Sequence, residues 1–305
     1  PIYQMQESTN EALRQLPVRL LIADYTDSSK AKAMSLAMNA TADIPYDAVV
    51  IMDADNTAGT SFLSELNPVF QSGARAVQAH RTAKNTNTDI AVLDAASEEI
   101  NNSIFRSGHI ALGLSSALIG SGMALEACWF RQHIHLLETA GEDKEMEALL
   151  LKQRIHIEYL EHVYVKDEKT QKKEGIKNQR KRWIAAQFDS LVRALPDFPK
   201  ELLRGNIDYC DKVFQWTLLP RIILIFCTFF FTILVTLVSP YSSIKWWILA
   251  FALFLALFTA IPGHLLNKQL LRAMFQLPSL LLGIASNLFK LKGVNKKFIH
   301  TEHGN

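Results

Sequence analysis

Two long apolar runs constrain this chain more than any other feature of its sequence. Residues 222–239 hold only apolar residues plus Thr, Ser and one Cys, and residues 246–262 are apolar again after a polar turn at 239–243. Each run reaches the short end of the ~17–25 residues that a helix needs to cross a bilayer. A buried hairpin in a soluble core is the alternative. Adjacent runs this rich in Phe and Trp favour a transmembrane hairpin.

Charges around these runs predict an orientation. Lys212 and Arg221 precede the first run, Lys268 and Arg272 follow the second, and the connecting turn offers only Lys245. Positive residues collect on the cytoplasmic side of membrane helices. We therefore expect both ends of the hairpin in the cytosol and the turn outside, in a multi-pass protein of the inner (cytoplasmic) membrane.

A third apolar segment, residues 265–290, is interrupted by charge. Lys268 and Arg272 shorten its apolar stretch, which favours an interfacial amphipathic helix over a third membrane-spanning segment. The sequence thus predicts a membrane region at 216–305, with transmembrane helices at about 222–239 and 246–262. It leaves residues 1–215 as a cytosolic domain.

Residues 1–215 alternate between strand-like and helix-like segments, which predicts an α/β fold, a sheet flanked by helices. Nearly continuous apolar runs bounded by polar turns are typical of buried strands. The expected strands lie at 18–23, 46–52, 74–80 and 155–166, and the expected helices at 30–42, 61–72, 88–118 and 143–152.

Composition disfavours several classes of function. The chain has 305 residues and a net charge of only +2, so nothing argues for nucleic acid as a partner. It contains no G-x-x-x-x-G-K-S/T or G-x-G-x-x-G motif, which disfavours a P-loop kinase or a Rossmann oxidoreductase. Its three cysteines show no zinc-binding spacing, which indicates packed thiols in a reducing compartment.

The sharpest local motif, a D-x-D formed by Asp53 and Asp55, directly follows the apolar run 46–52. Carboxylates two residues apart beyond a strand can present oxygens to one Mg²⁺ or Mn²⁺, which often shares its ligands with substrate phosphates. Such an ion neutralises charge on a leaving diphosphate. Taken alone, the motif is explained equally well by the preference of Asp for turns.

Two further groups carry possible chemistry. Glu142 and Asp143 open an expected helix, where a carboxylate can act as general base toward an acceptor hydroxyl, or simply cap the helix. Gln179, Arg182 and Trp183 combine a planar amide, a fork suited to phosphate and an indole that stacks on sugars. A solvated basic stretch with one aromatic anchor is the plainer explanation of that second group.

The order of these motifs favours their functional explanations over the plainer ones. A D-x-D, then E-D, then Q-x-x-R-W, followed at once by apolar helices, resembles the family-2 glycosyltransferases of the cellulose, chitin and hyaluronan synthase type. The matching residues are Asp53, Asp55, Asp143, Gln179, Arg182 and Trp183. Residues 30–35 resemble the family's K-A-x-A-L-N segment, and 120–124 its small-residue stretch lining the acceptor site. The resemblance runs from about Leu20 to Trp183.

The resemblance implies a GT-A fold, a nucleotide-sugar donor of the UDP-sugar type and an inverting displacement with Asp143 as base. It implies Mg²⁺ or Mn²⁺ bound by Asp55, with Asp53 also near the metal. It assigns the donor diphosphate and sugar to Lys30, Asp53, Asp55, Gln179 and Arg182. It assigns the acceptor to Gly122, Glu142 and Trp183.

Departures from the family pattern shape the remaining hypotheses. Asp24 and Asp27 lie too close to Lys30 to serve as the family's nucleotide-base-binding aspartate, so we expect the chain to lack the first strands and part of the donor pocket. Ser35 stands where the family usually has Asn, and Lys32 where a small residue is common.

A polysaccharide synthase is the leading hypothesis for function. A single-addition transferase acting on a lipid-linked acceptor is the alternative enzyme, and a non-catalytic membrane scaffold of the same fold is the alternative class. Two spanning helices are few for a secretion channel, which suggests either a missing N-terminal helix or a partner subunit for export.

Overall fold

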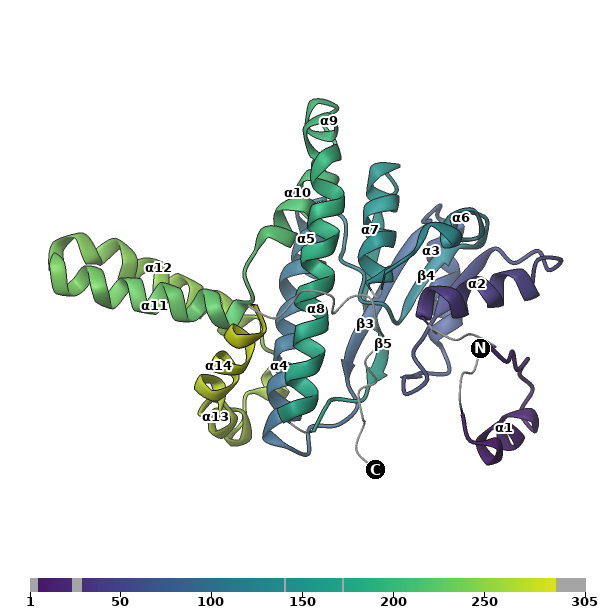
Figure 1. The fold of residues 1–305 in the computed structure, drawn as a ribbon, viewed down its shortest axis with the longest axis horizontal. Coiled ribbons are helices and arrows are strands. Elements are labelled where there is room, and N and C mark those ends of the chain that lie inside the picture. The colour runs from purple at the N-terminus through teal and green to yellow at the C-terminus, as the bar shows by residue number, and fades with distance from the viewer. Residues whose placement is uncertain (1–4, 24–28, 140, 172, 289–305) are drawn as a thin grey trace.

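The computed structural model describes residues 5–23, 29–139, 141–171 and 173–288 (Figure 1). Five strands form one mixed sheet in the order β1-β4-β3-β5-β2. They are β1 (Ala48–Ile51), β2 (Thr57–Ala58), β3 (Ala76–Ala83), β4 (Met123–Glu126) and β5 (Ile157–Asp167). Strands β3 and β5 pair in parallel and the other neighbours are antiparallel. The expected α/β class is confirmed, and a mixed sheet with flanking helices is consistent with a GT-A fold.

Helices surround this sheet and continue beyond it. Those up to residue 152 are α1 (Glu7–Arg14), α2 (Lys30–Ala40), α3 (Phe62–Gln71), α4 (Asp89–Asn102), α5 (Gly108–Ala111), α6 (Ala127–His133) and α7 (Glu142–Lys152). The later ones are α8 (Lys173–Ala194), α9 (Phe198–Leu203), α10 (Ile207–Thr217), α11 (Arg221–Val238), α12 (Pro240–Thr259), α13 (Lys268–Met274) and α14 (Leu277–Leu288).

The alternation of side chains along β3 builds two apolar layers. Val77 and Ala79 face α3, where they join Phe62 and Leu66 in one cluster. Ala76 points to the other face and joins the larger cluster formed with α2, α6, α7 and α10. Successive residues of a strand point to opposite faces, so a sheet covered on both sides needs apolar residues at nearly every position.

Most expected elements are present, with two corrections. The strand expected at 18–23 is wrong: Ile22 makes one isolated bridge and its side chain is 65% exposed. The helix expected at 88–118 ends earlier, at Ala111, after α4 passes through a π-helical turn at Ser103–Ser107. Strand β4 and helix α8 had no counterpart in the sequence-based assignment.

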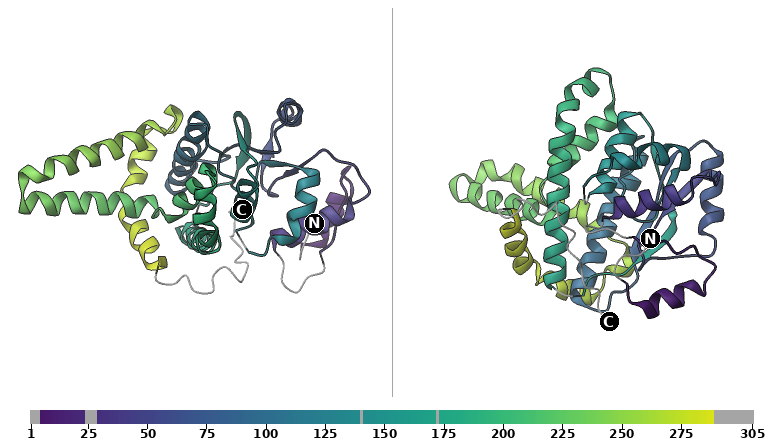
Figure 2. Two further views of the ribbon diagram at one scale, coloured as in Figure 1. Left: turned by 90° about the horizontal axis from the view of Figure 1, so that it is seen from above. Right: turned by 45° about the vertical axis from the view of Figure 1, so that its right-hand side comes forward.

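Helices α11 and α12 form a hairpin that projects away from the sheet (Figures 1 and 2). Helix α12 begins at Pro240, well before the predicted 246, because Pro suits a first helical turn and the Ser239 side chain accepts a hydrogen bond from the Ser242 N–H. Both helices are long and apolar enough to cross a membrane by length and composition. Only 11% of each apolar window is buried, unlike a soluble core helix.

The segment expected to form one interfacial helix contains two within its described residues. Helices α13 and α14 are separated by a turn at 275–276. Helix α13 packs against α4, where Arg272 pairs with Asp89 at 2.7 Å, and α14 packs against α8. Residues 289 and 290 of the predicted segment lie outside the described residues.

Candidate active site

The candidate site lies at one end of the sheet. Strands β1, β3 and β5 run in the same direction, so their carboxyl ends meet there. Residues 53–56 leave β1 at one edge of the sheet and lead into β2 at the other, passing the end of β5. Ligand sites of α/β sheets lie outside the carboxyl ends of strands. The predicted D-x-D occupies this position.

Lys30 joins the D-x-D to the start of α7. It is the first residue of α2, whose N-terminus is capped by the Ser29 hydroxyl accepting from the Lys32 N–H at 3.2 Å. The Lys30 ammonium donates hydrogen bonds to Asp53 Oδ1 and to the Gly120 carbonyl. Its Nζ lies 3.7 Å from Glu142 Oε1. A cation therefore sits between two carboxylates contributed by different elements.

Gly120 is the point on which these side chains converge. Its φ of +78° lies in the left-handed region that favours glycine. A Cβ at this position would lie 3.6 Å from Glu142 Oε1, 3.7 Å from Lys30 Nζ and 3.9 Å from Asp143 Oδ2. The structure thus brings the predicted donor residue Lys30 and the predicted E-D pair around one stretch of backbone.

Glu142 has an unusual environment for a carboxyl group. Burial, followed by the charge of Asp143, raises its pKa to about 7, although Lys30 acts in the opposite direction. Asp143 Oδ1 accepts a hydrogen bond from the Lys144 N–H at 2.9 Å. A carboxyl group with a pKa near neutrality is suited to proton exchange with a substrate.

Helix α8 brings Arg182 to the same region. Gly141 packs against it so closely that a Cβ there would lie 2.9 Å from Ala186 Cβ, one turn beyond Arg182. Burial lowers the pKa of the Arg182 guanidinium, while the carboxylates of Glu142 and Asp53 act to raise it. Arg182 therefore shares the electrostatic environment of the carboxylate cluster.

The two other members of the predicted Q-x-x-R-W have different surroundings. The Arg180 guanidinium lies 5.1 Å from the centroid of the Trp183 ring, which is 37% exposed. Gln179 Oε1 is buried and has no hydrogen-bond partner within the described part of the chain. An indole with this exposure suits stacking on a sugar, and a buried amide oxygen suits a donor from outside the chain.

Asp53 and Asp55 fit a hard divalent cation in their chemistry. Both are partly exposed carboxylates on one turn, and Mg²⁺ sites typically use one or two carboxylates together with substrate phosphates. No group of three or more His, Cys, Asp or Glu side chains that could hold a metal occurs in the described ranges. Two carboxylates on one turn suit an ion that shares its ligands with substrate phosphates.

Asn56 directly follows the D-x-D, but the sequence did not identify it as a site residue. Its Nδ2 donates to Asp55 Oδ1 and to Asp167 Oδ1, each at 3.0 Å. Its Oδ1 accepts from the Ser121 hydroxyl, which itself accepts from the Asp53 N–H at 3.0 Å. One amide thus ties the D-x-D to the end of β5 and to the loop before β4.

Behind Asn56 lies a network of buried charges. Lys169 pairs with Asp167 at 2.8 Å and with Glu98, and Arg81 donates to Glu98 at 2.5 Å. Burial alone would raise the pKa of Glu98, but the charges of Arg81 and Lys169 outweigh burial and lower it to about 2. The two pairs that involve Glu98 join residues 17 and 71 positions apart, so no local motif predicted them.

Gly122, expected at the acceptor, is fixed by the sheet. Its φ is +66°, and a Cβ would lie 3.0 Å from Val165 Cγ2. Its N–H donates to the Ile51 carbonyl at 2.9 Å, and its carbonyl accepts from the Ala79 N–H at 2.8 Å. These contacts give Gly122 a structural requirement that is independent of any acceptor.

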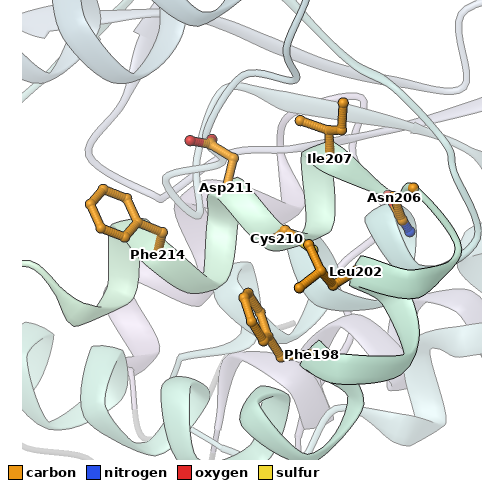
Figure 3. A pocket seen from close by; sticks show the side chains of 8 residues that line it. Phe198, Leu202, Asn206, Ile207, Cys210, Asp211 and Phe214 are labelled. Carbon is orange, nitrogen blue, oxygen red and sulfur yellow. The ribbon is translucent and has the colours of Figure 1, made fainter.

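A separate apolar cavity of about 310 Å³ lies between α9 and α10 (Figure 3). Its lining residues include Phe198, Leu202, Ile207, Cys210 and Phe214. Asp211 at its edge is already paired with His109 at 3.1 Å. This cavity offers no cation to a diphosphate, so the carboxylate cluster is the better candidate site.

Comparison with known proteins agrees with this choice. Residues 48–259, well over half the chain, match the family described as glycosyl transferase family group 2. The chain belongs to this glycosyltransferase family. The match begins at β1, includes the D-x-D turn, the start of α7 and α8, and ends with α12. No curated protein matched the sequence.

Proposed function

We propose that this glycosyltransferase transfers a sugar from a nucleotide-sugar donor, a UDP-sugar, to a growing glycan at the cytosolic face of the inner membrane. The convergence of Lys30, Asp53, Glu142 and Asp143 at Gly120 carries the proposal. A lysine and several carboxylates close together at one end of the sheet support displacement of a nucleoside diphosphate.

The donor diphosphate meets Asp55, Asp53, Lys30 and Arg182 in this proposal. The D-x-D carboxylates would hold Mg²⁺ or Mn²⁺, which neutralises charge on the leaving diphosphate. Arg182 offers a planar fork to phosphate oxygens, and Gln179 adds an amide. Lys30 lies within ion-pair distance of Asp53 and Glu142 in the structure, and its ammonium would also attract a donor phosphate.

Asp143 serves as the general base in the transfer step. The acceptor hydroxyl loses its proton to the carboxylate as its oxygen attacks the anomeric carbon, and the diphosphate leaves from the opposite face, which inverts the configuration. Glu142 and Trp183 lie on the acceptor side. A base within hydrogen-bond reach contributes about 10²–10⁴-fold to such a step.

The hairpin and the order of motifs favour a polysaccharide product. An exposed α11–α12 hairpin with cationic residues at its outer ends supports membrane attachment with the catalytic domain in the cytosol. A partner subunit for export would supplement two spanning helices. A single addition to a lipid-linked acceptor uses the same site, so product length separates the two functions.

The test is nucleotide release by the full-length protein in membranes, measured over a panel of nucleotide sugars. We expect one donor to be consumed, with full dependence on Mg²⁺ or Mn²⁺ and on Asp55. Asp143→Asn should lower kcat by at least about 10² while donor affinity by calorimetry stays within a few-fold. A Glu142→Gln variant that is dead beside a normal Asp143→Asn variant would move the base to Glu142.

Two outcomes would overturn the proposal more widely. Turnover that survives excess EDTA or Asp55→Ala contradicts the role of the metal. No turnover with any donor, in membranes that contain the folded wild-type protein, favours the non-catalytic scaffold.

A further inference from the structure

A pair of arginines where the hairpin joins the catalytic domain has no role in the proposed transfer. Arg221 is the first residue of α11, and Arg180 lies on α8. Arg180 occupies a position between the Gln and Arg of the Q-x-x-R-W, so the motif does not explain it. Both side chains reach Ser97 on α4.

The contacts around Ser97 are those of a crowded positive centre. Its hydroxyl accepts from Arg180 Nη2 at 3.0 Å and from Arg221 Nη2 at 2.9 Å. Arg221 Nη2 also donates to the Ser97 carbonyl at 2.7 Å. A neutral serine thus joins two guanidinium groups of the same charge.

The charge there is only partly neutralised. Asp94 accepts from Arg180 at 3.0 Å, whereas among the described residues no carboxylate lies within ion-pair distance of Arg221. Arg221 Nη1 is buried and has no hydrogen-bond partner in the same part of the chain. A buried donor without an acceptor is unfavourable, and more so when the group is charged. An anion would remove both deficits.

We infer that Arg180 and Arg221 form a binding site for the phosphate group of an anionic membrane lipid. Guanidinium forks match phosphate oxygens in geometry, and two of them exceed the single carboxylate present. The Arg180 side chain is 23% exposed, so the centre is open to solvent on that side.

The position of the pair identifies a lipid as the source of the phosphate. Arg221 is the first residue of an apolar helix, so in a spanning hairpin it lies at the depth of the lipid headgroups. Figure 1 shows α11 leaving the domain beside α4 and α8, with α14 next to its base. This inference rests on the membrane attachment in the proposed function, but not on the transfer reaction.

The experiment measures lipid binding by the full-length protein, purified in neutral detergent and stripped of lipid. Phosphatidylglycerol, phosphatidylcholine and inorganic phosphate are added separately, and bound lipid is counted by native mass spectrometry beside the melting temperature. We expect wild type to retain phosphatidylglycerol and to gain thermal stability from it. Phosphatidylcholine and inorganic phosphate should have much smaller effects.

Variants assign the site to the two arginines. Arg221→Gln and Arg180→Gln should each weaken phosphatidylglycerol binding by about tenfold or more, the loss expected for a charged hydrogen bond. Arg221→Lys keeps the charge without the fork and should recover part of the binding, which a folding defect would not allow. Arg272→Gln, which removes an arginine that is 71% exposed and paired with Asp89, is the matched control and should bind as wild type.

Three results would overturn the inference. The first is equal binding of the two lipids by wild type, and the second is unchanged binding in both glutamine variants. The third is inorganic phosphate binding as tightly as the lipid, which would make this a site for a soluble anion. Extraction of wild type from membranes by alkaline carbonate would instead refute the transmembrane hairpin. Lipid counting in detergent distinguishes that failure from loss of the phosphate site.

Discussion

Two regions of the molecule depart from the usual distribution of residues. The polar end of the sheet buries charged side chains, and the α11–α12 hairpin exposes apolar ones. Near the sheet end, Arg81, Glu98 and Lys169 are charged and almost entirely removed from solvent. On the hairpin, apolar side chains are exposed, among them Phe230 at 51% and Leu237 at 82%. At the sheet end the cost of burying these charges is offset within the protein, because each buried charge has a partner of opposite sign.

Among the described residues, other parts of the protein do not cover the exposed apolar side chains of the hairpin. Fully burying a Leu, Ile or Phe contributes about 1.5–3 kcal/mol, so a hairpin left in water forgoes that amount at many positions. A bilayer restores it. A buried charge thus indicates a partner of opposite sign within the protein, whereas an exposed apolar helix indicates an apolar environment around it.

Removing one charge from the buried network should have the largest effect. Glu98→Gln leaves Arg81 and Lys169 without their shared carboxylate, and breaking a buried pair costs about 3–5 kcal/mol. Thermal unfolding in detergent at pH 7 checks this loss. Because the pKa of Glu98 is lowered to about 2, its stabilisation is present above the unfolded value of 4.5 and disappears as pH falls toward 2.

The matched control uses a carboxylate whose pair is open to solvent. Glu7 bonds Arg14 at 2.9 Å, with both side chains more than half exposed, so Glu7→Gln should leave the melting temperature nearly unchanged. Equal losses in the two variants would show that burial does not distinguish these pairs.

Placing a charge in the hairpin tests whether its exposed apolar side chains lie in a membrane. Phe230→Arg in α11 should cost about 3 kcal/mol of membrane insertion, by the difference between the two residues at a helix centre. The carbonate-resistant fraction of the protein in cell membranes measures it. Phe214→Arg makes the same change at a 60%-exposed position on α10 and should leave insertion intact. Equal behaviour of both variants would place α11 outside the membrane.

Glu142 is a buried carboxyl group whose titration should make the stability of the protein depend on pH. Its pKa rises from 4.5 to about 7 on folding, so the folded state holds a proton that the unfolded state releases. Stability should therefore fall as pH increases through this window, by about 3 kcal/mol at most. Glu142→Gln removes the titration and should flatten the dependence.

The measurement is the difference in melting temperature between wild type and Glu142→Gln from pH 4 to 8, in EDTA. We expect the variant to gain on wild type as pH rises. Glu161→Gln, at an exposed position on β5, controls for loss of any one carboxyl group. A difference that is constant with pH would contradict the buried environment of Glu142.

The sequence was informative where the physical cause is local. The apolar run 46–52 led to β1 and the turn after it, and runs of about 17 residues led to α11 and α12. It misled at 18–23, because an apolar run becomes a strand only if a sheet edge accepts it, and Ile22 makes a single bridge. Helix α8 was missed because its many charged residues hide the apolar period.

Contacts between distant residues could not be predicted from one sequence. Lys30 meets Gly120 and Glu142 only once the sheet has brought three elements together. Strand β2 has two residues, too few for any periodicity, although it anchors the far end of the D-x-D turn. The candidate carboxylates were identifiable by their motifs, whereas the residues that orient them were not.

Asn56 is the clearest of those orienting residues, and its removal should have the smallest effect of the four. Asn56→Ala deletes the donor that Asp55 and Asp167 share, yet leaves every carboxylate in place. Loss of such a partner typically weakens metal affinity by about 10–100-fold. The half-saturating Mn²⁺ concentration for nucleotide release should rise by that factor, while kcat at saturating Mn²⁺ stays within a few-fold. A purely structural defect would instead lower kcat at every metal concentration. Asn87→Ala, on an exposed loop, should change neither quantity. An unchanged Mn²⁺ requirement in Asn56→Ala would contradict the role of Asn56 in orienting Asp55.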